Sequence, residues 1–272
     1  MSIIIPNQDH IANLNMCIDT IVAKTSYSNY EIIIIENNSK DESTKAGYQA
    51  LVAKYNNVRL VQYEGAFNAA LINNFGAKEA NCDYLLFLNS NTKVINDDWL
   101  TELLQEAMPQ DVGVVGAKLY YADDTIEHVG IVVGLGGATG LPFCGMPKND
   151  VGYARRAITT QEVSGVSAAC MLVKRTVFEK INGFDEQFAV AYNDVDLCLR
   201  TSVAGYRVIF TPYAQLYHYE SENHGKEVGV GTKRFIRERK LFCKRWKDLI
   251  KNGDPYYNQN LSRVNPVGKL RV

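Results

Sequence analysis

The stretch YLLFLNSNTKVINDDW, residues 84–99, decides how the rest of the chain is interpreted. Its four apolar residues at 85–88 run directly into the polar triplet Asn89-Ser90-Asn91. A short apolar run that ends in small polar residues is typical of a buried central strand in a parallel sheet. Ligands of open α/β sheets bind just beyond the carboxyl ends of such strands. The triplet is therefore expected at a binding site, although it offers amides and a hydroxyl rather than carboxylates.

The residues before this stretch alternate between β-branched runs and helical spacing of apolar side chains. Strands are predicted at 3–5, 31–36 and 58–61, with helices between them. This alternation favours βαβ units and a parallel sheet. Right-handed crossovers would place the strand ends at Pro6, Glu36 and Asn89 on one edge, around a crevice of nucleotide size. The chain contains neither GxGxxG nor GxxxxGK[ST], which excludes a dinucleotide fingerprint and a P-loop.

The second half of the chain differs from the first in composition and in the spacing of its apolar residues. Residues 113–140 are rich in glycine and β-branched side chains, and residues 141–160 are expected to form a long mobile loop with a functional role. Asp194 is expected to begin a helix that Gly205 closes. A strand at 206–210 with Pro212 follows, and His218 lies beyond it.

No linker divides the sequence, so we predict one α/β domain over residues 1–250. Within it, residues 1–110 would form a nucleotide-binding half and residues 111–225 an acceptor half. Residues 233–251 predict a basic amphipathic helix, which either packs with a solvated basic face or lies on an anionic membrane surface. Residues 252–272 are expected to form a flexible tail. The abrupt start inside a strand suggests a domain cut from a longer protein.

Composition narrows the class of function. The 272 residues carry a formal net charge of −1, which argues against bulk nucleic-acid binding. No apolar run approaches the length of a membrane span, and no signal peptide is evident. The six cysteines are scattered without a CxxC pair and are interpreted as reduced core residues of a cytoplasmic protein.

Ten segments in series resemble a bacterial glycosyltransferase of family 2, of GT-A type and of the rhamnosyltransferase-like branch. They cover about residues 2–225 in the order of the family. The segments are SIIIPNQD (2–9), EIIIIENNSKDES (31–43), FNAALINNFGAKEA (67–80), YLLFLNSNTKVINDDWL (84–100), DVGVVGAKL (111–119), IEHVG (126–130), VSGVSAACMLVKR (163–175), GFDEQF (183–188), NDVDLCLRTSVAGYRV (193–208) and TPYAQLYHYES (211–221).

The resemblance implies a GT-A fold, with a Rossmann-like, mostly parallel central sheet flanked by helices and an added acceptor-side lobe. It also implies inverting transfer of a sugar from a nucleoside diphosphate to a hydroxyl of a glycan or lipid-linked acceptor in cell-surface polysaccharide synthesis. The scattered cysteines favour a cytoplasmic location, and the basic helix predicted at 233–251 would allow peripheral contact with the inner membrane surface.

Carried over by position, the donor-binding residues lie mainly in the first half. Glu36, where the family usually has aspartate, would accept from a pyrimidine N3–H and so favour UDP- or dTDP-sugars; a solvated charge at the strand end is the alternative. Asn89 and Ser90, at the end of the central strand, are also implied to contact the nucleotide sugar. The remaining implied contacts to the nucleotide sugar are Pro6, Gln8, Asn68, Asn74 and Gly165. Taken alone, either asparagine could instead be a helix cap or a surface amide.

Asp194 matches the general base of the family, which takes the proton from the attacking acceptor hydroxyl. The structural alternative for Asp194 is a helix N-cap. Asn193 replaces the glutamate that usually precedes this base. His218 and Asn91 match positions that contact a divalent cation, Mg²⁺ or Mn²⁺, or the donor diphosphate.

The departure from the family is the absence of an aspartate in Asn89-Ser90-Asn91. For a unit charge pair near 4 Å, losing the carboxylate removes about 4 kcal/mol of attraction at an effective dielectric constant of ~20. Three interpretations stay open: an enzyme with weak or donor-dependent metal use, a metal-independent enzyme, and a pseudoenzyme that binds sugar nucleotide or glycan without transfer. A nucleotidyltransferase acting on sugar phosphates ranks below these, because its Gly-rich basic loop near the N-terminus is missing.

Overall fold

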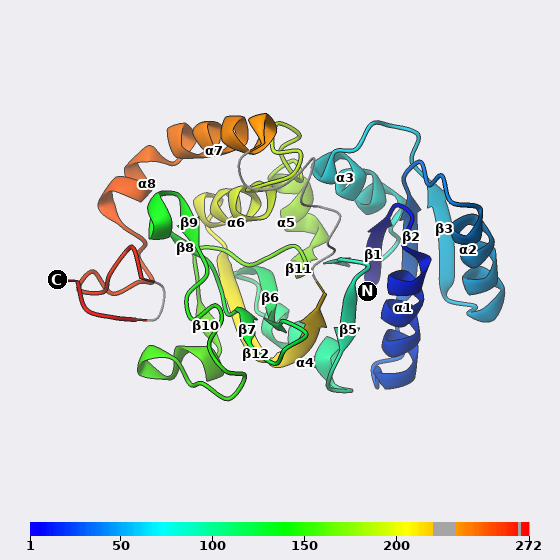
Figure 1. Ribbon diagram of the computed structural model, residues 1–272, viewed down its shortest axis with the longest axis horizontal. Helices are drawn as coiled ribbons and strands as arrows, with labels where there is room; N and C mark the ends of the chain where they lie inside the picture. Colours follow the sequence, from blue (N-terminus) through cyan, green and yellow to red (C-terminus); the bar gives the residue numbers. More distant parts are fainter. Residues whose placement is uncertain (220–231, 266–267, 272) are drawn as a thin grey trace.

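A ten-stranded mixed sheet forms the centre of the computed structural model, which describes residues 1–219, 232–265 and 268–271 (Figure 1). Two further strands, β8 (Val132–Val133) and β9 (Thr139–Gly140), pair separately. The main sheet runs in the order β10 (Gln161–Glu162), β12 (Arg207–His218), β6 (Val112–Tyr120), β11 (Cys170–Lys174), β4 (Tyr84–Leu88), β1 (Ser2–Asn7), β2 (Glu31–Glu36) and β3 (Val58–Gln62), with β5 (Thr92–Val94) on β12 and β7 (Ile126–His128) on β6.

Most strands of the sheet share one direction. β3, β2, β1 and β4 are parallel neighbours, and β11 is antiparallel to both β4 and β6, so β6 and β12 point the same way as β4. Asn7 at the end of β1 pairs in register with Glu36 at the end of β2. The carboxyl ends of β1, β2 and β4 therefore meet at one edge, as the sequence predicts.

Helices cover both faces of the sheet because its strands are apolar on both sides. Ile3 and Ile5 pack toward α1 (Ile11–Lys24), α2 (Glu42–Lys54) and α4 (Trp99–Ala107). Ile4 belongs to the core of the opposite face, with α3 (Ala69–Glu79), α5 (Arg175–Lys180) and α6 (Asn193–Val203). Side chains alternate across a strand, so one isoleucine run supplies both layers of the core.

Strand β12 is longer than predicted. The sequence places its end near Pro212, but the strand continues to His218 through a register shift between Phe210 and Gln215. A proline is tolerated in a strand at such an irregularity, because the ladder hydrogen bond is already interrupted there. The prediction that His218 lies beyond the strand is therefore wrong, and the histidine is the last residue of β12.

The basic segment at 233–251 forms two helices rather than one. α7 (Lys233–Arg245) and α8 (Lys247–Asn252) meet at Trp246. Phe242 of α7 is fully buried in a third apolar cluster with Phe188 and Leu199. One face of α7 thus packs on the domain, which agrees with the packing interpretation, while contact with a membrane stays a prediction.

Two segments expected to be mobile pack against the domain. Residues 141–160 contain the short 3₁₀ helix η2 (Tyr153–Ile158), and Phe143 and Ala157 are buried in the core. In the C-terminal segment, Asp254 accepts a hydrogen bond from the backbone N–H of Val133, and Leu261 is 2% exposed. Their apolar anchors are too far apart in sequence to form a periodic pattern.

All six cysteines are free, and Cys17, Cys170 and Cys198 are buried. The three buried cysteines agree with the predicted core positions, whereas Cys82, Cys144 and Cys243 are half-buried. Across the described parts of the chain, no helix combines the length and apolar character that a membrane crossing requires.

Candidate active site

The ends of β1 and β2 form one side of the candidate site. Pro6 is half-buried, Gln8 is exposed, and Glu36 is half-buried beside them in the paired register. One carboxylate oxygen of Glu36 accepts the backbone N–H of Ser39. The structure brings these three predicted donor-binding residues to the same edge, and the second carboxylate oxygen of Glu36 accepts no hydrogen bond from a described residue.

Asn68 and Asn74 hold α3 to the turn at 183–186. Asn68 caps α3 by accepting from the backbone N–H of Leu71 at 3.1 Å, and its amide donates to the carbonyl of Glu186 at 3.0 Å. Asn74 donates to the carbonyl of Phe184 and accepts from its N–H, both at 2.9 Å. Both amides make structural links within the protein, and a contact of either with a nucleotide stays a prediction.

The end of β4 meets the end of β12 through a chain of three side chains. His218 places Nδ1 at 2.8 and 3.0 Å from the two carboxylate oxygens of Glu127, and its Nε2 lies 3.2 Å from the amide nitrogen of Asn89. Because the carboxylate only accepts, the Nδ1 nitrogen carries the proton and donates to Glu127. With the proton on Nδ1, the lone pair of Nε2 faces the amide of Asn89 as an acceptor.

Glu127 is the residue that the sequence reasoning missed at this position. It comes from β7, is 8% exposed, and brings a carboxylate beside the triplet that lacks one. Its only signal in the sequence was its place beside His128 in IEHVG. Asn91 is 9% exposed and its amide donates to the carbonyl of Tyr219, while Ser90 is half-buried. The segment TPYAQLYHYES (211–221) ends with residues 220 and 221, which lie outside the described residues.

Asp194 lies in the first turn of α6 and lines a cavity of about 320 Å³ that Glu127 also lines. Its carboxylate accepts from the backbone N–H groups of Val195 at 2.8 Å and Ala168 at 3.3 Å. Burial raises the pKa of the carboxyl, and these hydrogen bonds oppose the rise. The N-cap position of α6 belongs to Tyr192, so Asp194 is not the helix cap.

The loop before Asp194 is held by a buried glutamate from α7. Glu238 has no exposed surface, and its carboxylate accepts from the backbone N–H groups of Ala189 at 3.2 Å, Val190 at 3.2 Å and Ala191 at 2.8 Å. A carboxylate that accepts from several N–H groups fixes the backbone firmly, because charge-assisted hydrogen bonds are stronger than those between neutral groups. In the sequence Glu238 is one acid within a basic helix and gives no sign of this contact.

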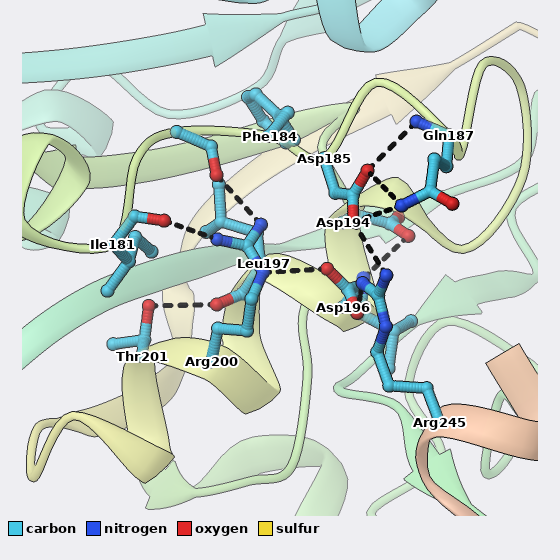
Figure 2. A network of polar contacts seen from close by, with 12 residues as sticks. Ile181, Phe184, Asp185, Gln187, Asp194, Asp196, Leu197, Arg200, Thr201 and Arg245 are labelled. Atoms are coloured by element: carbon cyan, nitrogen blue, oxygen red, sulfur yellow. Dashed lines mark hydrogen bonds and ion pairs between the residues drawn. The ribbon is translucent and has the colours of Figure 1, made fainter.

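The next carboxylate of α6, Asp196, joins two helices. It is fully buried and accepts from Arg200 at 2.7 Å, Arg245 at 2.8 Å and the indole of Trp246 at 3.0 Å. Figure 2 shows Arg200 and Arg245 pointing toward Asp196, with Asp194 beside it. Asp196 thus anchors α7 to α6.

His128 supports the backbone under Asp194. Its Nε2 accepts from the N–H groups of Gly130 and Ser167, both at 3.3 Å. Complete burial lowers the pKa of the imidazole to about 3, so the ring stays neutral and keeps this acceptor. The residue after Ser167, Ala168, is the one that donates to Asp194.

Gly165 packs against the first turn of α6. A β-carbon built at this glycine would lie 3.3 Å from Val195 Cγ1 and 3.5 Å from Ile131 Cβ. The absence of a side chain therefore allows close packing of the 165–168 backbone on the helix that carries Asp194. Contact of Gly165 with a donor sugar stays a prediction.

The family model for "Glycosyl transferase family 2" matches residues 2–182 of this chain. The chain is 37% identical to the uncharacterized protein y4gI of Sinorhizobium fredii and 35% identical to the O-antigen biosynthesis protein RfbC of Myxococcus xanthus, with 96% of the chain aligned in each case. It spans 29% and 20% of the lengths of these two relatives. It is also 39% identical to the rhamnosyltransferase WbbL of Escherichia coli, over 39% of this chain and 37% of WbbL.

Two solved structures are similar in fold. GalNAc-T7 with UDP, GalNAc and Mn²⁺ superposes with a TM-score of 0.74, at 14% identity, over 92% of this chain and 49% of that chain. The mannosyltransferase PcManGT from Pyrobaculum calidifontis, in complex with GDP-Man and Mn²⁺, gives a TM-score of 0.64, at 14% identity, over 92% and 64%. With the mostly parallel sheet, these similarities confirm the predicted GT-A fold.

Proposed function

The chain belongs to glycosyl transferase family 2, and from this premise we propose that it moves a sugar from a nucleoside diphosphate to a hydroxyl group of a growing cell-surface glycan. The observation that carries the proposal is that Asp194 lines one cavity together with Glu127, whose carboxylate holds His218 beside Asn89. A base for the acceptor thus lines the same cavity as the carboxylate that holds His218.

Asp194 would act as the general base. Its carboxylate would take the proton from the acceptor hydroxyl as that oxygen attacks the anomeric carbon and the bond to the diphosphate breaks. Attack from the side opposite the leaving group inverts the configuration at that carbon. Burial raises the pKa of Asp194 and so makes its carboxylate a stronger base, which favours this proton transfer.

On the donor side, the nucleobase would lie at the ends of β1 and β2. Glu36 has one oxygen bound to Ser39 N–H, and the other would accept the N3–H of uracil or thymine. Pro6 and Gln8 would lie against the base and ribose. Uracil and thymine both carry this N3–H, so the proposed donors are UDP- or dTDP-sugars.

The diphosphate would lie where β4 and β12 end. Among the described residues, no three His, Cys, Asp or Glu side chains group closely enough to hold a metal ion. Glu127 nevertheless fixes His218 with Nδ1 protonated, the usual arrangement of a metal-binding histidine, and Mg²⁺ is commonly held by few protein ligands plus substrate phosphates. His218 and Asn91 would then hold the cation, which supplies neutralisation of the leaving diphosphate.

The exposed face of α7 suggests where the enzyme works. Its exposed basic side chains accompany Ile236, which is 44% exposed. Basic residues around an apolar side chain suit an anionic membrane surface, where a lipid-linked acceptor would be presented. The basic side chains are Lys233, Arg234, Arg237, Arg239, Lys240 and Lys244.

The test is a donor panel. Thermal unfolding is measured with UDP-, dTDP- and GDP-sugars, each with and without Mn²⁺, and release of nucleoside diphosphate is followed with an acceptor glycan. We expect stabilisation by the pyrimidine nucleotides and acceptor-dependent release. Stabilisation without any release across acceptors and metals would support instead a sugar-nucleotide-binding pseudoenzyme, which the carboxylate-free triplet Asn89-Ser90-Asn91 favours. No stabilisation by any nucleotide would contradict both proposals.

A further inference from the structure

A second cavity, of about 290 Å³, lies in the acceptor half, outside the space that Asp194 lines. It is formed where the η2 segment meets the C-terminal segment, and Figure 1 shows both on the side of the sheet away from α1 and α2. The two cavities share no lining residue. The residues around the second cavity are Pro142, Phe143, Tyr153, Ala154, Arg156, Thr159, Gln161, Tyr257, Asn258 and Leu261.

Arg156 gives this cavity a cation without a partner. Its side chain is half-buried, and its guanidinium makes no hydrogen bond or ion pair with the described residues. Desolvation lowers the pKa of Arg156, and Asp254 opposes this effect from a distance. Removing a charge from water without pairing it is unfavourable, and an anion in the cavity would restore the lost interactions. The planar guanidinium is suited to carboxylate and phosphate groups.

Gln161 ties the Arg156 segment to the wall of the cavity. Its amide nitrogen donates to the carbonyl of Arg156. Its Oε1 has no hydrogen bond from any described residue and almost no accessible surface, so this oxygen lies behind the lining of the cavity.

Aromatic rings supply the walls, and hydrogen bonds fix two of them. The hydroxyl of Tyr153 accepts from Asn258 at 3.0 Å, and the hydroxyl of Tyr257 donates to the carbonyl of Ser262 at 3.0 Å. Phe143 is 3% exposed. Rigid aromatic side chains offer apolar area for the C–H faces of a ring, while a few polar groups fix its orientation.

The backbone that carries Arg156 is held in an unusual conformation. Ala154 and Arg155 have φ values of 51° and 62°, in the left-handed region that favours glycine. The fully buried Ala157 anchors the segment, and its carbonyl accepts from Lys118 Nζ at 2.9 Å. Such a conformation persists only where the surroundings fix it, so the segment is a built feature rather than a loose loop.

We propose that this cavity binds a sugar residue that carries a carboxylate or phosphate group. Arg156 would bind the anionic group, and Tyr153 and Tyr257 would contact the ring. The site would hold the acceptor glycan at a distance from Asp194, and this assignment of the ligand as acceptor rests on the proposed function. Binding itself does not require transfer, so the two can be tested separately.

The experiment measures binding of glucuronate, glucose 6-phosphate, glucose and inorganic phosphate by ligand-observed NMR titration, on wild-type protein, Arg156→Gln and Arg155→Gln. The exposed neighbour Arg155 provides the matched loss of charge. We expect at least one of the two anionic sugars to bind at least tenfold more tightly than glucose and phosphate. That binding should weaken at least tenfold in Arg156→Gln and stay within twofold in Arg155→Gln.

Comparison of the two anionic sugars shows whether the site takes a uronate or a sugar phosphate. Equal binding by Arg156→Gln, or equal binding of glucose, would overturn the proposal, as would phosphate that binds as tightly as the sugars. Circular dichroism and thermal unfolding confirm that each variant folds. If the protein bound an anionic sugar but no nucleotide, the proposed function would be refuted and this binding site would stand. If it transferred sugar from a nucleotide donor but bound no anionic sugar, the proposed function would stand and this binding site would be refuted.

Discussion

The two sides of the candidate active site are built in different ways. On the nucleobase side, Glu36 is held by Ser39, three residues away, and Asp41 caps its own helix by accepting from Ser43 N–H. Around the diphosphate position and Asp194, His218 is held by Glu127, 91 positions away, and the loop before Asp194 is held by Glu238, 47 to 49 positions away. The Glu36 carboxylate is thus held within its own turn, whereas the carboxylates on the catalytic side fix segments that are distant in the sequence.

This difference predicts where substitutions act most strongly. Substitution of a buried carboxylate on the catalytic side should lower the rate of transfer. Substitution of an exposed or locally held carboxylate should change only donor affinity, or have no measurable effect. Each of the following variants tests one side of that contrast.

Asp194→Asn should have the largest effect. It removes the base but leaves the donor side intact, so transfer should fall by about 10²–10⁴-fold, the usual contribution of general base catalysis. Donor affinity, measured by calorimetry, should stay within threefold. Transfer by this variant within tenfold of wild type would show that another group takes the proton.

Glu127→Gln should weaken use of the cation. The carboxylate orients the His218 ring, and loss of such a partner typically costs about 10–100-fold in metal affinity. The measurement is the Mn²⁺ concentration for half-maximal transfer, with His218→Ala as the comparison. An unchanged Mn²⁺ requirement in both variants would contradict a role for this pair in holding the metal.

Glu238→Gln should lower transfer by about tenfold and reduce the free energy of unfolding by about 1–3 kcal/mol, because a neutral amide satisfies the three N–H groups less well. Michaelis constants for the donor should not change. The matched control is Glu42→Gln, since Glu42 is 84% exposed in its ion pair with Lys45, and the change should alter stability by less than about 0.5 kcal/mol. If Glu238→Gln lost stability with unchanged kcat, the residue would be structural only.

Glu36→Gln should have the smallest effect. Its amide oxygen still accepts a hydrogen bond, but the charge is lost, so affinity for a uridine or thymidine nucleotide should fall by about three- to tenfold. kcat should remain as in wild type. An unchanged donor affinity in this variant would show that the nucleobase lies away from Glu36.

Much of the fold could be predicted from the sequence because its information is local. The isoleucine runs of β1 and β2 and the apolar run of β4 define strands by composition alone, and the start of α6 at Asn193 was predicted within one residue. The extension of β12 past Pro212 was not predictable, because an irregularity in the ladder depends on pairing with β6 and β5.

The candidate site was predictable only in part. Asp194, Asn89 and His218 stand within recognisable motifs, and the structure brings Asn89 and His218 into contact. Glu127 and Glu238 were missed because a buried carboxylate looks like a surface charge in a sequence. Their partners are a histidine on another strand and three backbone N–H groups, which no spacing rule indicates.

The most direct test of Asp194 as the base is the pH dependence of single-turnover transfer with saturating donor. A base must be deprotonated, and burial raises the pKa of Asp194, so the rate constant should rise with pH through that raised pKa and then level. The midpoint should lie above the ordinary aspartate value of about 3.9. The rise should be absent from the residual rate of Asp194→Asn. A rate constant independent of pH between 4 and 7, or a rise that persists in the variant, would contradict the account.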